Sequence, residues 1–194
     1  MFEDINPENI TYLDIETQHL ITEFEGGWKN PKNYGKIKVA EVGILRNNVY
    51  TTFEESNINA LISELDDSEL IIGHNIIQFD YKVLDHYIPK DIMFRIILKS
   101  FDTMIEFDKF TGEAGWVSLN DIAQRNFGMK KTEDSVKIPE MYREGKIDEV
   151  KHYLLNDLKM TEQFYLLGKK GHIFKYDHKV YGKSYGEKEV YVKW

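Results

Sequence analysis

Two acidic residues interrupt a short apolar segment near the start of the chain, where residues 10–17 read Ile-Thr-Tyr-Leu-Asp-Ile-Glu-Thr. Branched and aromatic residues in this density are typical of a β-strand inside a sheet. Residues two apart in a strand project from the same face, so Asp14 and Glu16 would point the same way. Two buried neighbouring carboxylates repel each other, and a divalent cation between them offsets that repulsion. Taken alone, the segment fits a metal site and an edge strand with a wet polar face about equally well.

A third acidic residue, Asp80, stands where a short apolar run at residues 70–73 gives way to a helical pattern at residues 80–87. Functional groups of open α/β sheets gather at such junctions between a strand and a helix. A carboxylate at a helix N-terminus also has an ordinary explanation, because it interacts favourably with the helix dipole. Considered by itself, Asp80 fits the ordinary explanation better.

A fourth acidic residue, Asp157, lies inside a strongly apolar helical pattern, next to Leu158 and one turn after Tyr153. An unpaired carboxylate in such surroundings is unfavourable. Because residues four apart share a helix face, the Tyr153 phenol and the Asp157 carboxylate could converge on one point. The alternative is an exposed Asp157 beside a core tyrosine.

The composition indicates a soluble globular protein, with 42% hydrophobic and 30% charged residues among 194. This length suffices for one full domain and a small appendage. The sequence contains 0 cysteines, which excludes disulfides and thiolate zinc sites and fits a reducing compartment. No apolar run approaches the length of a membrane span, and residues 1–7 lack the order of a signal peptide. We therefore expect a cytoplasmic protein with no membrane association.

The formal net charge of -8 argues against a protein that coats nucleic acid, since such surfaces are normally basic. It does not exclude an enzyme that meets a phosphodiester through metal ions, because bound cations invert the local field. Lysines gather at residues 29–38, 130–131 and 169–183. Each group could contact phosphates, although a solvated loop or tail is the better interpretation of each group alone.

Hydrophobic periodicity predicts an α/β fold with a mixed five-stranded sheet flanked by helices. The first three strands are expected to form an antiparallel meander, because a tight turn at residues 46–48 joins the second to the third. Strands are expected at residues 10–17, 37–45, 49–53, 70–75 and 94–98. Helices are expected at residues 57–65, 80–87, 103–110, 119–127 and 147–168. We assign residues 1–170 to the main domain and residues 171–194 to a β-rich C-terminal extension, whose alternating pattern predicts either a terminal hairpin or an extended segment.

Together these residues resemble the DEDD superfamily of 3′-to-5′ exonucleases, which are DnaQ-like proteins with a ribonuclease-H-like fold. The motifs stand at residues 14–17, 75–80 and 153–157, in the family's order, and the resemblance spans about residues 8–168. It implies a ribonuclease-H-like fold for residues 1–170, with parallel strands after the three antiparallel ones. It also implies that two Mg²⁺ or Mn²⁺ ions are held by Asp14, Glu16, Asp80 and Asp157. By this resemblance the ions would activate a water for attack on the terminal phosphodiester and stabilise the leaving 3′ oxygen, releasing a nucleoside 5′-monophosphate.

The family divides by the residue that assists the attacking water, and this sequence offers two candidates. Tyr153 stands four residues before Asp157, and His152 stands five before it. A separation of five turns a helical side chain about 140° away from its partner, which favours Tyr153. The second motif, with Phe79 before its aspartate, is similar to the proofreading domains of family-B DNA polymerases, which belong to the tyrosine subclass. We therefore assign Tyr153 to orienting the water and His152 to the surface.

The resemblance also implies substrate contacts. Thr17 would contact the terminal nucleotide, and Asn75 would hydrogen-bond the strand. Leu20 matches a leucine that wedges against the last base, but Gln18-His19 replaces the common Thr-Gly pair before it, so a local loop anchor fits equally well. Phe79 is a further candidate substrate contact, although a core position suits it better than a stacking platform.

The leading hypothesis is a metal-dependent 3′-to-5′ exonuclease that acts on single-stranded DNA or RNA, with DNA favoured. It would be free-standing or recruited by a helicase, a polymerase or another repair or replication protein. One alternative is an endonuclease or resolvase on the same fold, which a circular substrate would distinguish. The other is a non-catalytic nucleic-acid-binding module, which would bind without turnover in Mn²⁺ and has little reason to keep four buried carboxylates.

Overall fold

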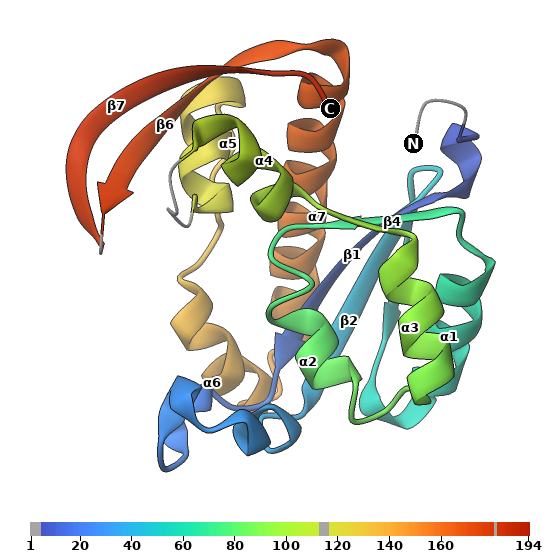
Figure 1. Cartoon of the computed structure of the whole chain (residues 1–194). Coiled ribbons are helices and arrows are strands. Elements are labelled where there is room, and N and C mark those ends of the chain that lie inside the picture. Colours follow the sequence, from blue (N-terminus) through green and yellow to red (C-terminus); the bar gives the residue numbers. More distant parts are fainter. Residues whose placement is uncertain (1–4, 113–116, 181) are drawn as a thin grey trace.

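Figure 1 presents the computed structural model of the chain, which describes residues 5–112, 117–180 and 182–194. Residues 1–4 lie outside the described residues, and they are part of the segment for which the sequence predicts no signal peptide. Residue 181 of the C-terminal extension also lies outside them. The statements below concern the described part of the chain.

Five strands form one mixed sheet in the order β3-β2-β1-β4-β5. The central strand β1 (Ile10–Thr17) pairs antiparallel with β2 (Val39–Arg46) and parallel with β4 (Leu70–Gly73). On the outer sides, β3 (Val49–Phe53) pairs antiparallel with β2, and β5 (Ser100–Asp102) pairs parallel with β4. The expected sheet, with three antiparallel strands followed by parallel ones, is confirmed.

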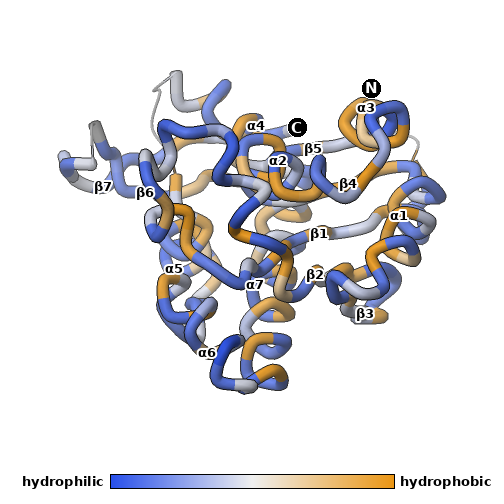
Figure 2. Tube along the Cα trace, turned by 90° about the horizontal axis from the view of Figure 1, so that it is seen from below, coloured by the Kyte–Doolittle hydropathy of each residue, from blue (hydrophilic) through white to orange (hydrophobic). Residues whose placement is uncertain are grey.

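The helices are α1 (Ile58–Asp67), α2 (Asp80–Leu84), α3 (Lys90–Leu98), α4 (Thr103–Thr111), α5 (Leu119–Phe127), α6 (Ile138–Arg143) and α7 (Ile147–Lys170). Each expected helix has a counterpart, and α3 and α6 are additional. In Figure 2 the turns of α1 and α7 alternate between hydrophobic and hydrophilic residues, as amphipathic helices do. None of the helices in the described part of the chain combines the length and the apolar character that a membrane span requires.

One expected strand, at residues 94–98, is wrong, because this segment is the second half of α3. Its isoleucines have strand propensity, but burial follows helical spacing. Met93 and Ile96 face the core at 4% and 0% exposure, while Phe94 and Leu98 are 62% and 67% exposed. The fifth strand is the short Ser100–Asp102 that follows the helix.

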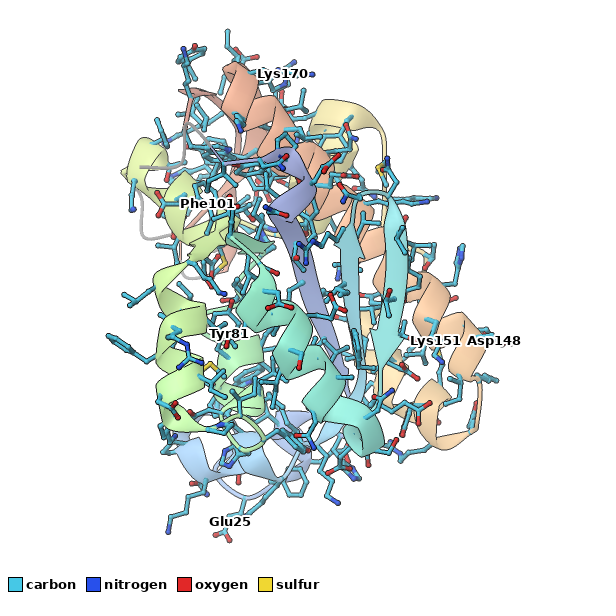
Figure 3. All side chains as sticks on the ribbon, turned by 90° about the vertical axis from the view of Figure 1, so that its right-hand side faces the viewer. Glu25, Tyr81, Phe101, Asp148, Lys151 and Lys170 are labelled. Atoms are coloured by element: carbon cyan, nitrogen blue, oxygen red, sulfur yellow. The ribbon has the colours of Figure 1, made fainter. Side chains whose placement is uncertain are left out.

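The side chains of β1 alternate between the two faces of the sheet. Leu13 is buried in the core shared with α1, α2 and α3, whereas Tyr12 is buried in a second cluster with Leu158 of α7. Because residues two apart share a face, Asp14 and Glu16 continue the face of Tyr12 and lie toward α7. Figure 1 shows α7 crossing that side of the sheet. In Figure 3 the same helix runs from the region of Asp148 to Lys170 at the far end of the molecule.

A glycine lets α7 approach the sheet closely at the level of Asp14. Gly43 of β2 is the direct partner of Asp14 in the antiparallel ladder. A Cβ atom at Gly43 would lie 2.8 Å from Cγ of Leu154 and 2.9 Å from Cδ1 of Leu158. The missing side chain therefore brings the middle of α7 against the end of β1.

The C-terminal extension is a long antiparallel hairpin of β6 (His172–Val180) and β7 (Lys183–Val192), which confirms the first of the two expected forms. Figure 1 shows it as a curved arm beside α4 and α5. Its base is not independent of the helices, since Phe174 and Val192 share a buried cluster with Phe107 and Phe164. The division of the chain at residues 170 and 171 stays a prediction.

Candidate functional site

Three of the four expected carboxylates meet where β1 ends against α7. Asp14 and Glu16 come from β1, and Asp157 comes from the facing side of α7. Each of these side chains offers one oxygen atom, and the three oxygens lie within 4.8 Å of one another. The alternation along β1 and the close approach of α7 at Gly43 together create this cluster. Oxygen atoms at such spacing can hold one hard cation such as Mg²⁺ or Mn²⁺.

The fourth carboxylate, Asp80, reaches the cluster from the start of α2. Its Oδ1 accepts a hydrogen bond of 3.1 Å from the backbone N–H of Ile15, the residue between the two acids of β1. Asp80 lines the same cavity of about 350 Å³ as Asp14, Glu16 and Asp157. It stands outside the group of three oxygens within 4.8 Å that the described residues form.

The loop that delivers Asp80 is shaped by special backbone positions. A Cβ at Gly73, the last residue of β4, would lie 2.0 Å from Cγ2 of Ile76, so the turn into the loop requires glycine. Asn75 adopts a left-handed conformation with φ of 67°, which asparagine tolerates better than most residues. The buried carboxylate of Asp102 accepts hydrogen bonds from the N–H groups of Asn75 (2.9 Å) and Ile77 (3.1 Å). These contacts fix the loop before α2 begins.

Tyr153 and Asp157 converge as their spacing on α7 predicted, and Lys131 joins them. The Lys131 ammonium donates to the Tyr153 hydroxyl at 2.6 Å and to Oδ2 of Asp157 at 2.5 Å. Tyr153 is 1% exposed, whereas His152 is exposed on the other side of the helix. The expected surface position of His152 is therefore confirmed.

Lys131 is the site residue that sequence reasoning missed. The sequence predicts a solvated loop or a phosphate contact at residues 130–131, whereas in the structure Lys131 turns inward toward the carboxylates. The loop is held by Asn120, whose Oδ1 accepts a 2.8 Å hydrogen bond from the Lys131 N–H. The signal that could have revealed it is electrostatic, because a cluster of buried acids requires a cation nearby.

Burial and mutual repulsion raise the pKa values of the clustered acids. Burial, and then the charges of Asp80, Asp157 and Glu16, raise the pKa of Asp14 well above its usual value. Burial and then Asp157 raise the pKa of Glu16 well above its usual value. Burial raises the pKa of Asp80 to about 8. Burial alone would lower the pKa of Lys131, but Asp157 and its neighbours raise it, so this lysine stays charged.

The donor atoms fit a divalent cation. Oδ1 of Asp157 is buried and, among the described residues, has no hydrogen-bond partner. Such an orphaned oxygen is unfavourable unless a ligand completes its coordination. The acidic groups that converge here offer only carboxylate oxygens as ligand atoms, which suits Mg²⁺ or Mn²⁺ better than soft metals.

The residues expected to contact substrate line the same cavity as the acids; they are Thr17, Leu20, Asn75 and Phe79. The Thr17 hydroxyl donates to the carbonyl of His19 at 2.9 Å, which orders the start of the following loop. Phe79 is half-buried: it packs on the core with one part and faces the cavity with another. A second cavity of about 650 Å³ shares Asp14, Asn75, Lys131 and Asp157 with the first and opens toward the start of α5. The acids thus lie where two cavities join.

The fold of this chain matches part of a solved polymerase. The structure of the family B DNA polymerase from the hyperthermophilic archaeon Pyrobaculum calidifontis matches 82% of this chain, with a TM-score of 0.57 and 15% sequence identity. The match covers 24% of the polymerase chain, so this chain spans about a quarter of that protein's length. At this identity the likeness concerns the fold. No protein-family model and no curated protein matches the sequence.

Proposed function

We propose that this protein is a metal-dependent 3′-to-5′ exonuclease of the tyrosine subclass of the DEDD superfamily, on a ribonuclease-H-like fold. Its substrate would be single-stranded nucleic acid, with DNA favoured, and its product a nucleoside 5′-monophosphate. The observation that carries the proposal is the convergence of four carboxylates and one tyrosine on a single cavity. The likeness in fold to part of a DNA polymerase supports a substrate of this class.

Asp14, Glu16, Asp80 and Asp157 would hold two Mg²⁺ or Mn²⁺ ions. When bound, the ions supply an activated water and charge neutralisation at the leaving oxygen. The positive charge of the ions would also stabilise the ionised carboxylates, since burial and mutual repulsion keep their pKa values high. Binding would therefore release protons from the acids.

Tyr153 would orient the attacking water as a hydrogen-bond donor. Burial, and then the charge of Asp157, raise the pKa of Tyr153 far above its usual value, so the phenol keeps its proton. Lys131 donates to the phenol oxygen, and the phenol itself hydrogen-bonds the Asp157 carboxylate, so it stands beside one of the proposed metal ligands. The same ammonium would attract the negatively charged phosphate of the substrate.

The shape of the cavity favours a single-stranded end. Leu20, Trp28, Val136 and Pro139 are among the residues that line it. A cavity of about 350 Å³ is of the size of a small-molecule site, so a terminal nucleotide must separate from a complementary strand to enter it.

The test is a time course on a 5′-labelled single-stranded oligonucleotide, as DNA and as RNA, in Mg²⁺, Mn²⁺ or EDTA. The parent should yield a ladder that shortens from the 3′ end, and EDTA or Glu16→Gln should abolish it. Tyr153→Phe should slow the reaction on the order of 10²-fold, a typical loss for a group that assists a reacting water. The matched control is Glu41→Gln, because Glu41 is 0% exposed and pairs with Glu16 across the sheet, yet is absent from the described cavity lining.

Other outcomes identify other functions. Cleavage of a circular single strand would favour an endonuclease. Binding of the oligonucleotide in Mn²⁺ with no turnover would contradict the exonuclease and favour a binding module. Equal loss of activity in Glu41→Gln and Glu16→Gln would show that a buried acid in the sheet, rather than this cavity, is what matters.

A further inference from the structure

Next to the acidic cavity lies a third, aromatic pocket of about 280 Å³. Its lining residues are Trp28, Tyr34, Asn75, Gln78, Phe79 and Lys82. Trp28, Asn75 and Phe79 line both cavities, so the two share a wall. The pocket is therefore within reach of a strand whose 3′ end lies among the carboxylates.

Three aromatic rings form the body of the pocket. The ring centroid of Trp28 lies 5.9 Å from that of Phe79 and 6.4 Å from that of Tyr34, and the contacts are tilted or edge-on. Trp28 nevertheless remains 58% exposed, a large fraction for the largest apolar side chain. Much of its surface is thus available to another flat ring.

The segment that presents Trp28 is held rigidly although it is irregular. Gly26 and Gly27 have φ values of 82° and 47°, a conformation that glycine adopts freely. The Asn33 side chain, 0% exposed, donates to the carbonyls of Glu25 (3.1 Å) and Gly27 (3.0 Å). Figure 3 places Glu25 at the tip of this segment, at the end of the molecule opposite Lys170. An exposed tryptophan on an ordered support is pre-organised for binding.

The polar residues at the rim match a nucleotide. The Lys82 ammonium lies 5.1 Å from the centroid of the Tyr34 ring and is exposed, so it can also reach a phosphate. Gln78 is exposed and offers an amide to the edge of a base. An aromatic surface beside a cation is the combination with which proteins hold single-stranded nucleic acid.

We propose that this pocket binds the base of the penultimate nucleotide, stacked on Trp28, while the terminal nucleotide occupies the acidic cavity. The inference rests on the proposed function, because it takes the 3′ end of a single strand as the ligand. Stacking tolerates any base, so the pocket would add affinity and register without sequence preference. It would also make a dinucleotide the smallest efficient substrate.

The experiment measures binding of a 5′-labelled oligothymidylate to the full chain in Ca²⁺, by fluorescence anisotropy. A second oligonucleotide carries a stable abasic residue at the penultimate position. The parent should bind the abasic strand about tenfold more weakly. Trp28→Ala should bind both strands with the lower affinity, and Trp28→Phe should recover most of the difference. The matched control is Phe94→Ala, since Phe94 is a 62% exposed aromatic residue on α3 that does not line the pocket.

A Trp28→Ala variant that still discriminates against the abasic strand would overturn the proposal, as would a parent that shows no discrimination or no binding. The same variants are then assayed for turnover in Mn²⁺, which separates the two proposals. Turnover with no effect of Trp28 refutes the pocket alone. Trp28-dependent binding with no turnover supports the pocket and refutes the exonuclease.

Discussion

The two halves of α7 pack against contrasting surroundings. The first half brings Tyr153 and Asp157 to the acids of β1, where pKa values are raised and Oδ1 of Asp157 has no partner among the described residues. The second half buries Phe164 against Phe174 and Trp194, with ring centroids 5.0 Å and 5.4 Å apart. One helix thus connects a region of unfavourable electrostatics to a region of dense apolar packing.

The contrast separates the sources of stability from the sources of chemistry. Apolar burial at the hairpin end favours the folded state, while the buried acids oppose it until a cation binds. Functional sites often break the rules that the rest of a fold obeys, and the remaining packing offsets their cost. The apolar packing of the second half of α7 therefore offsets the unfavourable electrostatics of the first half, where a ligand would bind.

Several charged residues of the hairpin are paired with opposite charges, whereas the carboxylates of the site repel one another. Lys175 lies within 4.0 Å of Glu187 and Glu189, and Lys179 pairs with Asp177. Lysines paired in this way are neutralised on the surface and offer little net charge to a phosphate. For Lys175 and Lys179, the solvated interpretation is therefore favoured over a contact with nucleic acid.

The largest effect is expected for Asp14→Asn, which should change activity and stability in opposite directions. Activity should fall on the order of 10³-fold, because a ligand of the proposed metal site is lost. The metal-free protein should instead gain about 1 kcal/mol of stability at pH 7, because the change removes one of several repelling carboxylates. Activity assays and urea unfolding in EDTA measure both effects, and a less stable variant would contradict the picture of a strained site.

The opposite result is expected for Phe174→Ala at the hairpin end. Phe174 is 0% exposed among aromatic rings, so its loss should lower the free energy of unfolding by about 3 to 5 kcal/mol. Mn²⁺ affinity at low temperature should stay within about twofold of the parent, because no described residue of the hairpin lines the cavity of the acids. Urea unfolding and calorimetric titration check the pair of values; a large loss of metal affinity would show that the two regions are coupled.

Gly43→Ala should change both the stability of the protein and its metal affinity. The added methyl group would press on Leu154 and Leu158, which typically costs about 1 to 3 kcal/mol, and it would move Asp157 away from Asp14. Stability and Mn²⁺ affinity should therefore fall together. In a double-mutant cycle with Leu154→Ala, the combined destabilisation should be smaller than the sum of the single changes. Strict additivity would mean that the close contact does not set the spacing.

The smallest effect concerns pH. Because burial raises the pKa of Asp80 to about 8, the folded metal-free protein holds this proton at neutral pH. Binding of a cation must displace it, so affinity should rise about tenfold per pH unit for each proton released and level off above pH 8. Asp80→Asn should flatten this slope between pH 7 and 8. Titration calorimetry in buffers of different ionisation enthalpy counts the protons directly.

The sequence predicts the core of the site because its geometry is local. Alternation along β1 puts Asp14 and Glu16 on one face, and helical spacing puts Tyr153 beside Asp157. The central sheet follows from similar periodicities. Lys131 could not be found in this way, since its direction depends on how the loop after α5 folds back toward α7. Trp28 could not be predicted for the same reason, because it lies in an irregular segment without hydrophobic periodicity.

The strand wrongly expected at residues 94–98 illustrates a second limit. Its branched residues have strand propensity, but tertiary packing buries only the helical positions Met93 and Ile96. The true strand, Ser100–Asp102, is too short to produce a pattern. Asp102 within it supports the loop of Asn75, so the missed strand and part of the site support belong together.

The hydrogen bonds of Asp102 also constrain the order in which the molecule folds. Its carboxylate binds the N–H groups of Asn75 and Ile77 across 27 and 25 residues of chain. The loop that delivers Asp80 therefore cannot become ordered until β5 docks beside β4, a non-local step that closes a long segment. The amide hydrogens of Asn75 and Ile77 should exchange with solvent only when this docking is reversed, so their exchange rates measure how often the assembled site comes apart.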